Sequence, residues 1–331
     1  MSALSQTDEK LAERLEAAGD KARHVHEAAA SVIFGQDRVI ELTLITLLAG
    51  GHALLIGVPG LAKTSLVETL GTVLGLNNKR IQFTPDLMPS DIIGSEVLEE
   101  GAGGKRSFRF LKGPVFTQLL MADEINRASP KTQSALLQAM QEHHVTMAGV
   151  NYPVPRPFHV LATQNPLEQE GTYPLPEAQL DRFLLQIDID YPDQAAERRM
   201  LFATTGLEET KLKPILNETD LMAAQRLVRQ MPVGEKVVDA ILTLVRSARP
   251  GSGAEDAINE QIAWGPGPRA SQALMLGVRA KALIDGRLAP SVDDVTALAE
   301  PILKHRMALT FAARAEGITV RSVIGSIAQR L

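Results

Sequence analysis

The first thirty residues carry apolar side chains at helical spacing. Leucine, alanine and valine recur every three or four positions between residues 4 and 30, which predicts a single amphipathic helix. We expect this helix to pack on its own domain. A coiled coil with a partner is the alternative, because the same spacing also suits a helix–helix seam.

Between Gly35 and about residue 191, short apolar runs alternate with helical segments. The runs at 53–56, 80–83, 119–122, 158–163 and 184–189 predict strands, and the segments 64–74 and 130–142 predict helices. The run 119–122 is apolar throughout, as expected for a strand that is buried on both faces of a parallel sheet. The alternation therefore predicts an α/β fold with a mainly parallel sheet between helices.

Two segments interrupt this alternation and predict β-hairpins. Residues of about 96–112 hold two short strand-like runs around Gly101, Gly103 and Gly104, which suit a turn. Residues of about 144–155 have Gly149 at their centre. Both hairpins are expected to be insertions in the α/β core.

The pattern changes after residue 191, where strand signals fade. Helical periodicity covers 193–205, 218–230, 235–248, 269–285 and 291–306, with glycine and proline between these segments. We therefore expect three parts: an N-terminal helical segment at 1–30, an α/β domain with the two hairpin insertions at 31–191, and a smaller helical domain at 192–331.

Composition narrows the classes of function. The 331 residues are 45% hydrophobic and 22% charged, which is ordinary for a globular protein. The net charge of −5 argues mildly against non-specific nucleic-acid binding. The chain has no cysteine, which excludes disulfides, thiolate metal sites and a thiol nucleophile. Because no signal peptide or membrane-spanning segment is evident, we expect a cytoplasmic protein without membrane insertion.

The segment Gly57-Val-Pro-Gly-Leu-Ala-Lys63-Thr64 lies between a predicted strand and a predicted helix. In this context, a glycine-rich loop holds phosphates with its backbone N–H groups, aided by the helix dipole. Lys63 would reach the β- and γ-phosphates, and the Thr64 hydroxyl would bind Mg²⁺. Ala62 replaces the second glycine of the usual pattern, and we expect right-handed backbone geometry there, because a methyl group disfavours positive φ. A turn without a ligand is the alternative.

Polar residues end two of the buried strands. Asp123 and Glu124 follow 119–122, at the edge where open α/β sheets bind ligands. Asp123 is placed to hold Mg²⁺, and Glu124 to polarise the attacking water. Asn165 follows the next strand and could bind the γ-phosphate or the water, although it could equally start the turn before Pro166.

Three arginines are candidates for charge neutralisation during phosphoryl transfer. Arg182 lies just before the last predicted strand, Arg269 starts a helix of the C-terminal part, and Arg127 follows the acidic pair. A guanidinium can stabilise the transferring phosphoryl group. Such arginines are more often surface or salt-bridge residues, so position alone does not assign this role.

Taken together, these motifs resemble the AAA+ ATPases, and specifically their MoxR branch. The matching segments occur in the family's order over about residues 30–285: Ile33-Phe-Gly-Gln36, Gly57–Thr64, Asp123-Glu-Ile-Asn-Arg-Ala128, Ala162-Thr-Gln-Asn-Pro166, Pro176-Glu-Ala-Gln-Leu-Asp-Arg-Phe183 and Gly267-Pro-Arg-Ala270. Alanine at position 62 is usual in this branch. The resemblance implies an AAA+ core followed by a helical lid.

The resemblance also implies roles for individual residues. Asn165 would be the first sensor, Arg182 the arginine finger that reaches the neighbour's ATP, and Arg269 the second sensor, from its own or an adjacent subunit. The catalytic set is then Lys63, Glu124, Asn165, Arg182 and Arg269, with Thr64 and Asp123 on the metal. The nucleotide would contact Ile33, Phe34, Gly35, Gln36, Gly57, Val58, Pro59, Gly60, Leu61, Ala62, Lys63, Thr64, Ser65 and Arg269.

At the level of function, the resemblance implies an ATP- and Mg²⁺-dependent hydrolase that forms a homo-oligomeric ring, typically a hexamer. Members of the family act as chaperone-like remodellers or metal-insertion factors, often alongside proteins with von Willebrand factor A domains, and their hairpins face a central pore. Two alternatives stay open: a nucleic-acid-dependent ring motor, and a nucleotide-gated scaffold with little turnover.

Overall fold

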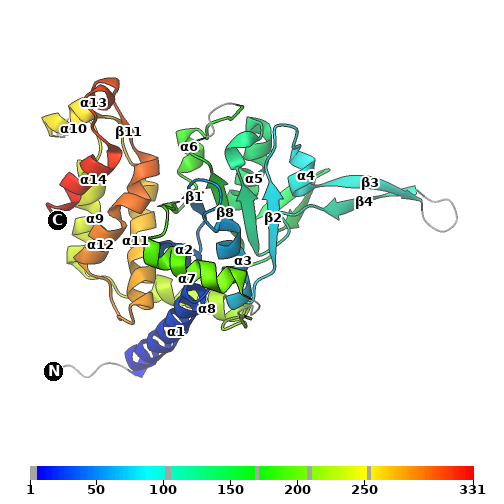
Figure 1. Cartoon of the computed structure of the whole chain (residues 1–331), viewed down its shortest axis with the longest axis horizontal. Helices are drawn as coiled ribbons and strands as arrows, with labels where there is room; N and C mark the ends of the chain where they lie inside the picture. Colours follow the sequence, from blue (N-terminus) through cyan, green and yellow to red (C-terminus); the bar gives the residue numbers. More distant parts are fainter. Residues whose placement is uncertain (1–5, 101–105, 168–170, 207–210, 252–254) are drawn as a thin grey trace.

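The computed structural model describes residues 6–100, 106–167, 171–206, 211–251 and 255–331. Its centre is a five-stranded sheet in which all neighbours are parallel, in the order β2-β5-β8-β1-β9 (Figure 1). The strands are β1 (Ala53–Ile56), β2 (Asn78–Gln82), β5 (Leu119–Asp123), β8 (His159–Gln164) and β9 (Leu185–Asp188). The predicted α/β class with a parallel sheet is confirmed.

Alternate residues of each central strand point to opposite faces of the sheet and enter different hydrophobic cores. Leu119 and Met121 of β5 belong to one buried cluster, whereas Leu120 and Ala122 belong to the other. Every residue of β5 is buried. This explains why residues 119–122 of this strand are all apolar rather than alternating with polar residues.

Helices cover both faces of the sheet. α1 (Gln6–Ala30), α2 (Asp37–Ala49) and α3 (Lys63–Val73) share the first cluster, and α5 (Pro130–Glu142) lies on the second, beside the short α4 (Pro89–Ile93). The N-terminal helix thus packs on its own chain, as expected. The Ser129 hydroxyl accepts a hydrogen bond from the Thr132 backbone N–H at 3.4 Å, which caps the start of α5.

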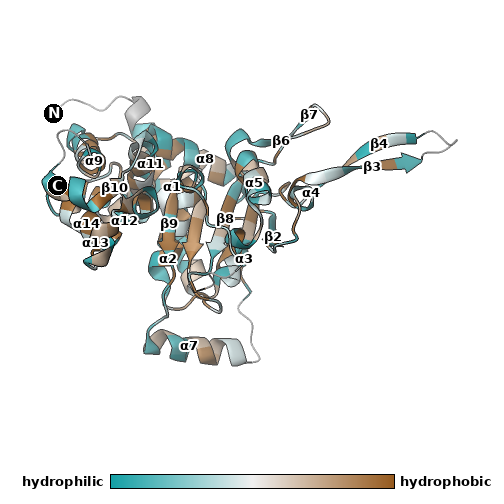
Figure 2. Ribbon diagram, turned by 90° about the horizontal axis from the view of Figure 1, so that it is seen from above, coloured by the Kyte–Doolittle hydropathy of each residue, from teal (hydrophilic) through white to brown (hydrophobic). Residues whose placement is uncertain are grey.

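The two predicted hairpins are present and stand away from the sheet (Figures 1 and 2). β3 (Gly94–Glu100) pairs with β4 (Arg106–Lys112), and β6 (His144–Met147) pairs with β7 (Val150–Pro153), both antiparallel. The glycine-rich tip predicted at Gly101, Gly103 and Gly104 lies outside the described residues. In the first hairpin, Leu98 is directly opposite Phe108, and their exposures are 54% and 72%.

The C-terminal part is mainly helical. Its larger elements are α7 (Gln194–Thr205), α8 (Glu218–Gln230), α9 (Glu235–Ser247), α11 (Pro268–Ile284), α12 (Val292–Leu303) and α14 (Val320–Ala328). α7 differs from the others: Ala196 is its one buried residue, Leu201 and Phe202 are exposed, and the helix stands clear of the sheet in Figure 2.

Sequence periodicity found most of the long elements, but it did not single out the thirteen-residue α2. The other missed elements include α4, α6 (Glu177–Leu180), α10 (Asp256–Gln261), α13 (Phe311–Ala315), α14 and the two-stranded pair of β10 (Ile262–Trp264) with β11 (Ala308–Leu309). Most span too few residues for a helical repeat to show. The first core cluster runs without a break from α1 to α14, so the division at residue 191 stays a prediction. Across the described ranges, no helix has the length and apolar character to cross a bilayer.

Candidate active site

The predicted phosphate loop connects β1 to α3 at the carboxyl edge of the sheet. Gly57 fits closely there, because a Cβ at this position would lie 2.8 Å from the Ile189 carbonyl oxygen. Gly60 has φ +86°, a value that favours glycine. The loop therefore depends on its glycines for both space and backbone conformation.

The expectation for Ala62 was wrong. Its φ of 54° and ψ of 22° place it in the left-handed region, as the N-cap of α3. A left-handed alanine costs about 1–2 kcal/mol. The Ala62 carbonyl accepts a hydrogen bond from the Leu66 N–H at 2.9 Å, so the turn into the helix outweighs the local strain.

Lys63 folds back on its own loop. Its ammonium donates to the Gly57 carbonyl at 2.5 Å and to the Val58 carbonyl at 3.2 Å. Burial lowers the pKa of Lys63, while the negative charges of Asp123 and Glu124 act in the opposite direction. The fold thus brings the lysine close to the acidic pair, as the sequence predicted.

Asp123 is buried and held by two neighbouring strands. Arg80 of β2 donates to its Oδ2 from Nη2 at 2.5 Å and from Nε at 3.2 Å. The Thr163 hydroxyl of β8 donates to its Oδ1 at 2.5 Å. Sequence reasoning missed both partners, because they meet Asp123 only through the register of the sheet.

Glu124 adopts a left-handed conformation with φ 53°. Its backbone N–H donates to the Thr163 hydroxyl at 2.8 Å, which holds this strained residue at the end of β5. Its carboxylate accepts from Gln82 at 2.7 Å and from Arg127 at 3.1 Å. Arg127 therefore lies beside the acidic pair of its own chain.

The oxygens near Lys63 suit a magnesium ion. Mg²⁺ prefers hydroxyl, carboxylate and water oxygens. The half-buried Thr64 hydroxyl has no hydrogen-bond partner in the part of the chain that the structure describes, so it is free to act as a ligand. The Asp123 carboxylate, although engaged by Arg80 and Thr163, keeps further lone pairs.

Asn165 follows β8 at the same edge and is 5% exposed. Its Oδ1 accepts a hydrogen bond from the Leu167 N–H at 3.1 Å, as expected of a residue that starts a turn. No partner of its amide nitrogen occurs among the described residues. Both interpretations of Asn165 are therefore compatible with its geometry.

The segment Ile33–Gln36 lies against the same edge. The Gln36 side chain donates to the Asp190 carbonyl at 2.8 Å, just beyond β9. Gly35 has φ +69°, and a Cβ there would lie 2.5 Å from the Cβ of Ala196. Ile33 is buried and Phe34 half-buried. The segment Ile33–Gln36, which the sequence analysis predicts to contact the nucleotide, thus adjoins the start of α7.

Arg182 and Arg269 lie at the opposite edge of the sheet. Together with Gly51, His52 and Leu184, which precede β1 and β9, they line a hollow of about 260 Å³. The four residues of β1 alone separate the two edges by about 13 Å. The structure therefore does not bring either arginine to the Lys63 of the same chain.

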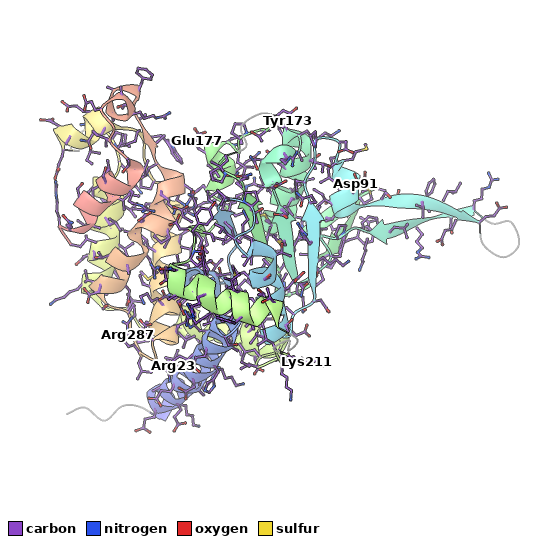
Figure 3. The ribbon with its side chains drawn as sticks, in the orientation of Figure 1. Arg23, Asp91, Tyr173, Glu177, Lys211 and Arg287 are labelled. Carbon is purple, nitrogen blue, oxygen red and sulfur yellow. The ribbon has the colours of Figure 1, made fainter. Side chains whose placement is uncertain are left out.

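Both arginines are anchored at that edge. Arg182 donates to the Leu137 carbonyl at 2.6 Å, and Arg269 forms an ion pair with Asp181 at 3.6 Å. Glu177, labelled in Figure 3, marks the start of α6 (Glu177–Leu180), the short helix just before them. Arg182 and Arg269, from two candidate motifs far apart in the sequence, thus meet on one surface.

Two family models match this chain. The model described as "ATPase family associated with various cellular activities (AAA)" matches residues 52–185, and the model of the AAA lid domain matches residues 254–327. The first match contains the phosphate loop, the acidic pair and Arg182, and the second contains Arg269.

Relatives match over most of their length. The chain is 43% identical to the chaperone MoxR1 of Mycobacterium tuberculosis, over 90% of this chain and 78% of the relative. It is 34% identical to the protein MoxR of Paracoccus denitrificans, over 87% and 88%. The crystal structure of a presumed ATPase from Cytophaga hutchinsonii is 38% identical and superposes with a TM-score of 0.88, covering 96% of each chain.

Proposed function

Because the chain belongs to the MoxR family of AAA+ ATPases, we propose that it hydrolyses ATP with Mg²⁺ between subunits of a homo-oligomeric ring and uses the energy to remodel or mature client proteins. In this proposal, the loop around Lys63 holds the phosphates, Glu124 polarises the attacking water, and Asn165 orients it. Thr64 and Asp123 would hold the metal ion, which neutralises phosphate charge when bound.

The separation of the arginines from Lys63 carries the proposal of a ring. Arg182 and Arg269 lie at the amino edge of the sheet, and the phosphate loop lies at the carboxyl edge of the same chain. The guanidinium of Arg182 or Arg269 can therefore reach a nucleotide only in the loop of another copy. A head-to-tail contact of this kind closes into a ring when its rotation permits, and hexamers are the form that the resemblance implies.

This arrangement also narrows the roles of the candidate arginines. Arg127 is bound to the Glu124 of its own chain and adjoins the nucleotide edge, so Arg182 is the better candidate for the finger that acts in trans. Arg269 would act on the neighbour's nucleotide as well, rather than on its own. An isolated subunit should then bind ATP but turn it over slowly.

The first hairpin favours a protein client over nucleic acid. Its arginines are balanced by glutamates on the facing strand, with Arg109 2.9 Å from Glu99 and Arg106 4.0 Å from Glu100. Along the described strands of this hairpin, such pairing leaves no continuous strip of unpaired arginines to displace counterions from a phosphate backbone. The exposed pair of Leu98 and Phe108 suits contact with apolar segments of a protein. A partner with a von Willebrand factor A domain remains an expectation from the resemblance.

Glu124→Gln tests the hydrolytic role. Loss of a general base typically lowers turnover about 10²- to 10⁴-fold, so the variant should bind ATP and release almost no phosphate. Wild-type phosphate release by this variant would support the nucleotide-gated scaffold instead.

The ring is tested by mixing Lys63→Ala with Arg182→Ala, each of which should be inactive alone. Mixed rings should recover activity, since some interfaces then combine an intact loop with an intact arginine.

A further inference from the structure

Four guanidinium groups and a single carboxylate line the hollow at the amino edge of the sheet. They belong to Arg182, Arg229, Arg269, Arg306 and Asp181. Because like charges repel at short range, such an excess of positive charge favours the binding of an anion in this hollow. The partners of each arginine show which of them is available for such an anion.

Arg306 is a structural residue. It is 2% exposed, and its guanidinium donates to Asp181 at 2.8 Å and to the carbonyls of Phe183 and Ile302 at 2.6 Å each. These bonds tie α12 to the chain before β9. Arg306 therefore has little capacity left for a ligand.

Arg229 is the opposite case. It is exposed, lies near the end of α8, and has no hydrogen-bond or ion-pair partner within the described ranges. Its Nη2 lies close to the Gly50 backbone, 4.0 Å from the position that a Cβ at Gly50 would take. The guanidinium therefore borders the hollow with all of its donors free.

A second arginine behind Arg229 adds to the unbalanced charge. The Nε of Arg279, on α11, is buried without a hydrogen-bond partner. Burial lowers the pKa of Arg279, and the positive charge of Arg229 lowers it further. A negative group at Arg229 would relieve this repulsion, so the cluster is electrostatically suited to an anion.

We propose that Arg229 is a third arginine that acts in trans, and that it contacts the terminal phosphates of the nucleotide held by the adjacent copy, beside Arg182 and Arg269. This inference rests on the proposed function, because it needs the phosphate loop of one copy to face the hollow of the next. The proposed phosphate contacts would then come from three places: Arg182 just after α6, Arg269 on α11 and Arg229 on α8.

The ligand is the triphosphate in the neighbour's loop, not a free nucleotide or phosphate ion. A free anion could satisfy the same charges, and the two sources make different predictions. A phosphate delivered by the neighbour makes Arg229 matter for turnover in the assembled ring. A free nucleotide would bind the hollow even when the chain's own loop is disabled.

Arg229→Ala is the test variant and Arg226→Ala its matched control. Arg226 lies one turn earlier on α8, is exposed, and does not line the hollow. Arg229→Ala should lower kcat by about tenfold to a hundredfold, less than the roughly 10³–10⁵ of a principal finger, with the Kd for ATP in dilute subunits unchanged. Arg229→Lys should restore part of the loss. Unchanged kcat for Arg229→Ala would overturn the proposal.

Mixing two variants shows whether Arg229 acts on the nucleotide of its own subunit or on that of the neighbour. Rings of Arg229→Ala with Lys63→Ala should recover about one quarter of wild-type turnover, the share of interfaces that random mixing leaves intact. The mixture of Arg182→Ala with Lys63→Ala is run in parallel. If it recovers and the Arg229 mixture does not, Arg229 acts within its own subunit and the proposal fails. If neither recovers, the proposed ring arrangement itself fails.

A direct binding measurement separates the two sources of the anion. Lys63→Ala is titrated with ATP, and so is the double variant Lys63→Ala, Arg229→Ala. No saturable binding to either protein supports delivery by the neighbour. Saturable ATP binding to the single variant that the second substitution abolishes would show a free-nucleotide site and overturn the assignment in trans.

Discussion

The Thr163 hydroxyl donates a hydrogen bond to the Asp123 carboxylate at 2.5 Å and accepts one from the Glu124 backbone N–H at 2.8 Å. One fully buried side chain on β8 thus orients both acidic residues at the end of β5. Because Glu124 is left-handed, this bond also supports a strained conformation next to the predicted phosphate loop.

Thr163→Val removes the hydroxyl and keeps the shape of the side chain. It leaves a buried carboxylate oxygen and a backbone N–H without this partner, which should cost about 1–3 kcal/mol of unfolding free energy. ATP turnover should fall much more than ATP affinity, since Asp123 and Glu124, the proposed metal ligand and the proposed water-polarising residue, lose their orientation. Thr163→Ser, which keeps the hydroxyl, should stay close to wild type in both assays.

Ala62→Gly tests the left-handed geometry of the phosphate loop. Glycine removes the cost of a Cβ at φ 54°, so folding stability should stay equal or rise by up to about 1 kcal/mol, with ATP binding retained. Ala62→Val should weaken both, because a β-branched residue is strongly disfavoured at positive φ. If residue 62 were right-handed, Ala62→Gly would instead lower the unfolding free energy.

Gly35→Ala should disturb the contact between the Ile33–Gln36 segment and α7. Its Cβ would lie 2.5 Å from Ala196 and 3.0 Å from Pro192, closer than carbon atoms pack. Gly171→Ala is the matched control, with the same φ of +69° and no described atom within 4 Å of its Cβ. Both substitutions introduce the same backbone strain. An additional loss of about 1–3 kcal/mol of unfolding free energy in Gly35→Ala therefore measures the steric clash with Ala196 and Pro192. Equal losses in denaturant unfolding would contradict this account.

Asp181→Asn should destabilise the chain. The Asp181 carboxylate forms ion pairs with the buried Arg306 at 2.8 Å and with the more exposed Arg269 at 3.6 Å. Removing one partner of a buried ion pair typically costs about 3–5 kcal/mol, because the remaining charge stays desolvated. Glu255→Gln, which breaks an ion pair with Arg330 on the surface, should cost less than about 1 kcal/mol. The comparison is made by denaturant unfolding.

Acid should destabilise the fold through two buried histidines. Burial, together with the positive charge of neighbouring histidines, lowers the pKa of His52 to about 3; burial lowers that of His159 to about 4. An unfolded histidine titrates near 6.5. Below about pH 6.5 the unfolded chain therefore takes up protons that the folded chain does not, so this stability is present above pH 6.5 and is lost as the pH falls toward 4.

The size of the acid effect can be measured. Each histidine contributes about 1.4 kcal/mol per pH unit between roughly pH 6 and pH 4.5. His159→Gln should reduce the pH slope of the unfolding free energy by that amount, and the curves should become parallel above pH 7.5. An unchanged slope would show that His159 titrates equally in both states.

Local sequence determined much of this protein. The strand Ala53–Ile56, the loop to Thr64, the acidic end of β5 and the cap at Ser129 each follow from a few neighbouring residues. Periodicity and turn chemistry depend on residues close together in the sequence, so the sequence alone predicted these features. The same locality explains the error at Ala62, where the demands of the turn into α3 exceed the intrinsic preference of alanine.

Only the tertiary structure decided which of these residues meet. Arg80 and Thr163 reach Asp123 because β2, β5 and β8 are neighbours in the sheet. The order of the strands cannot be predicted from the residues of any one strand. Arg182, Arg229 and Arg269 share one hollow although the chain between them is long. Their distance from Lys63 follows from the direction of parallel strands, which places opposite ends of β1 at opposite edges of the sheet.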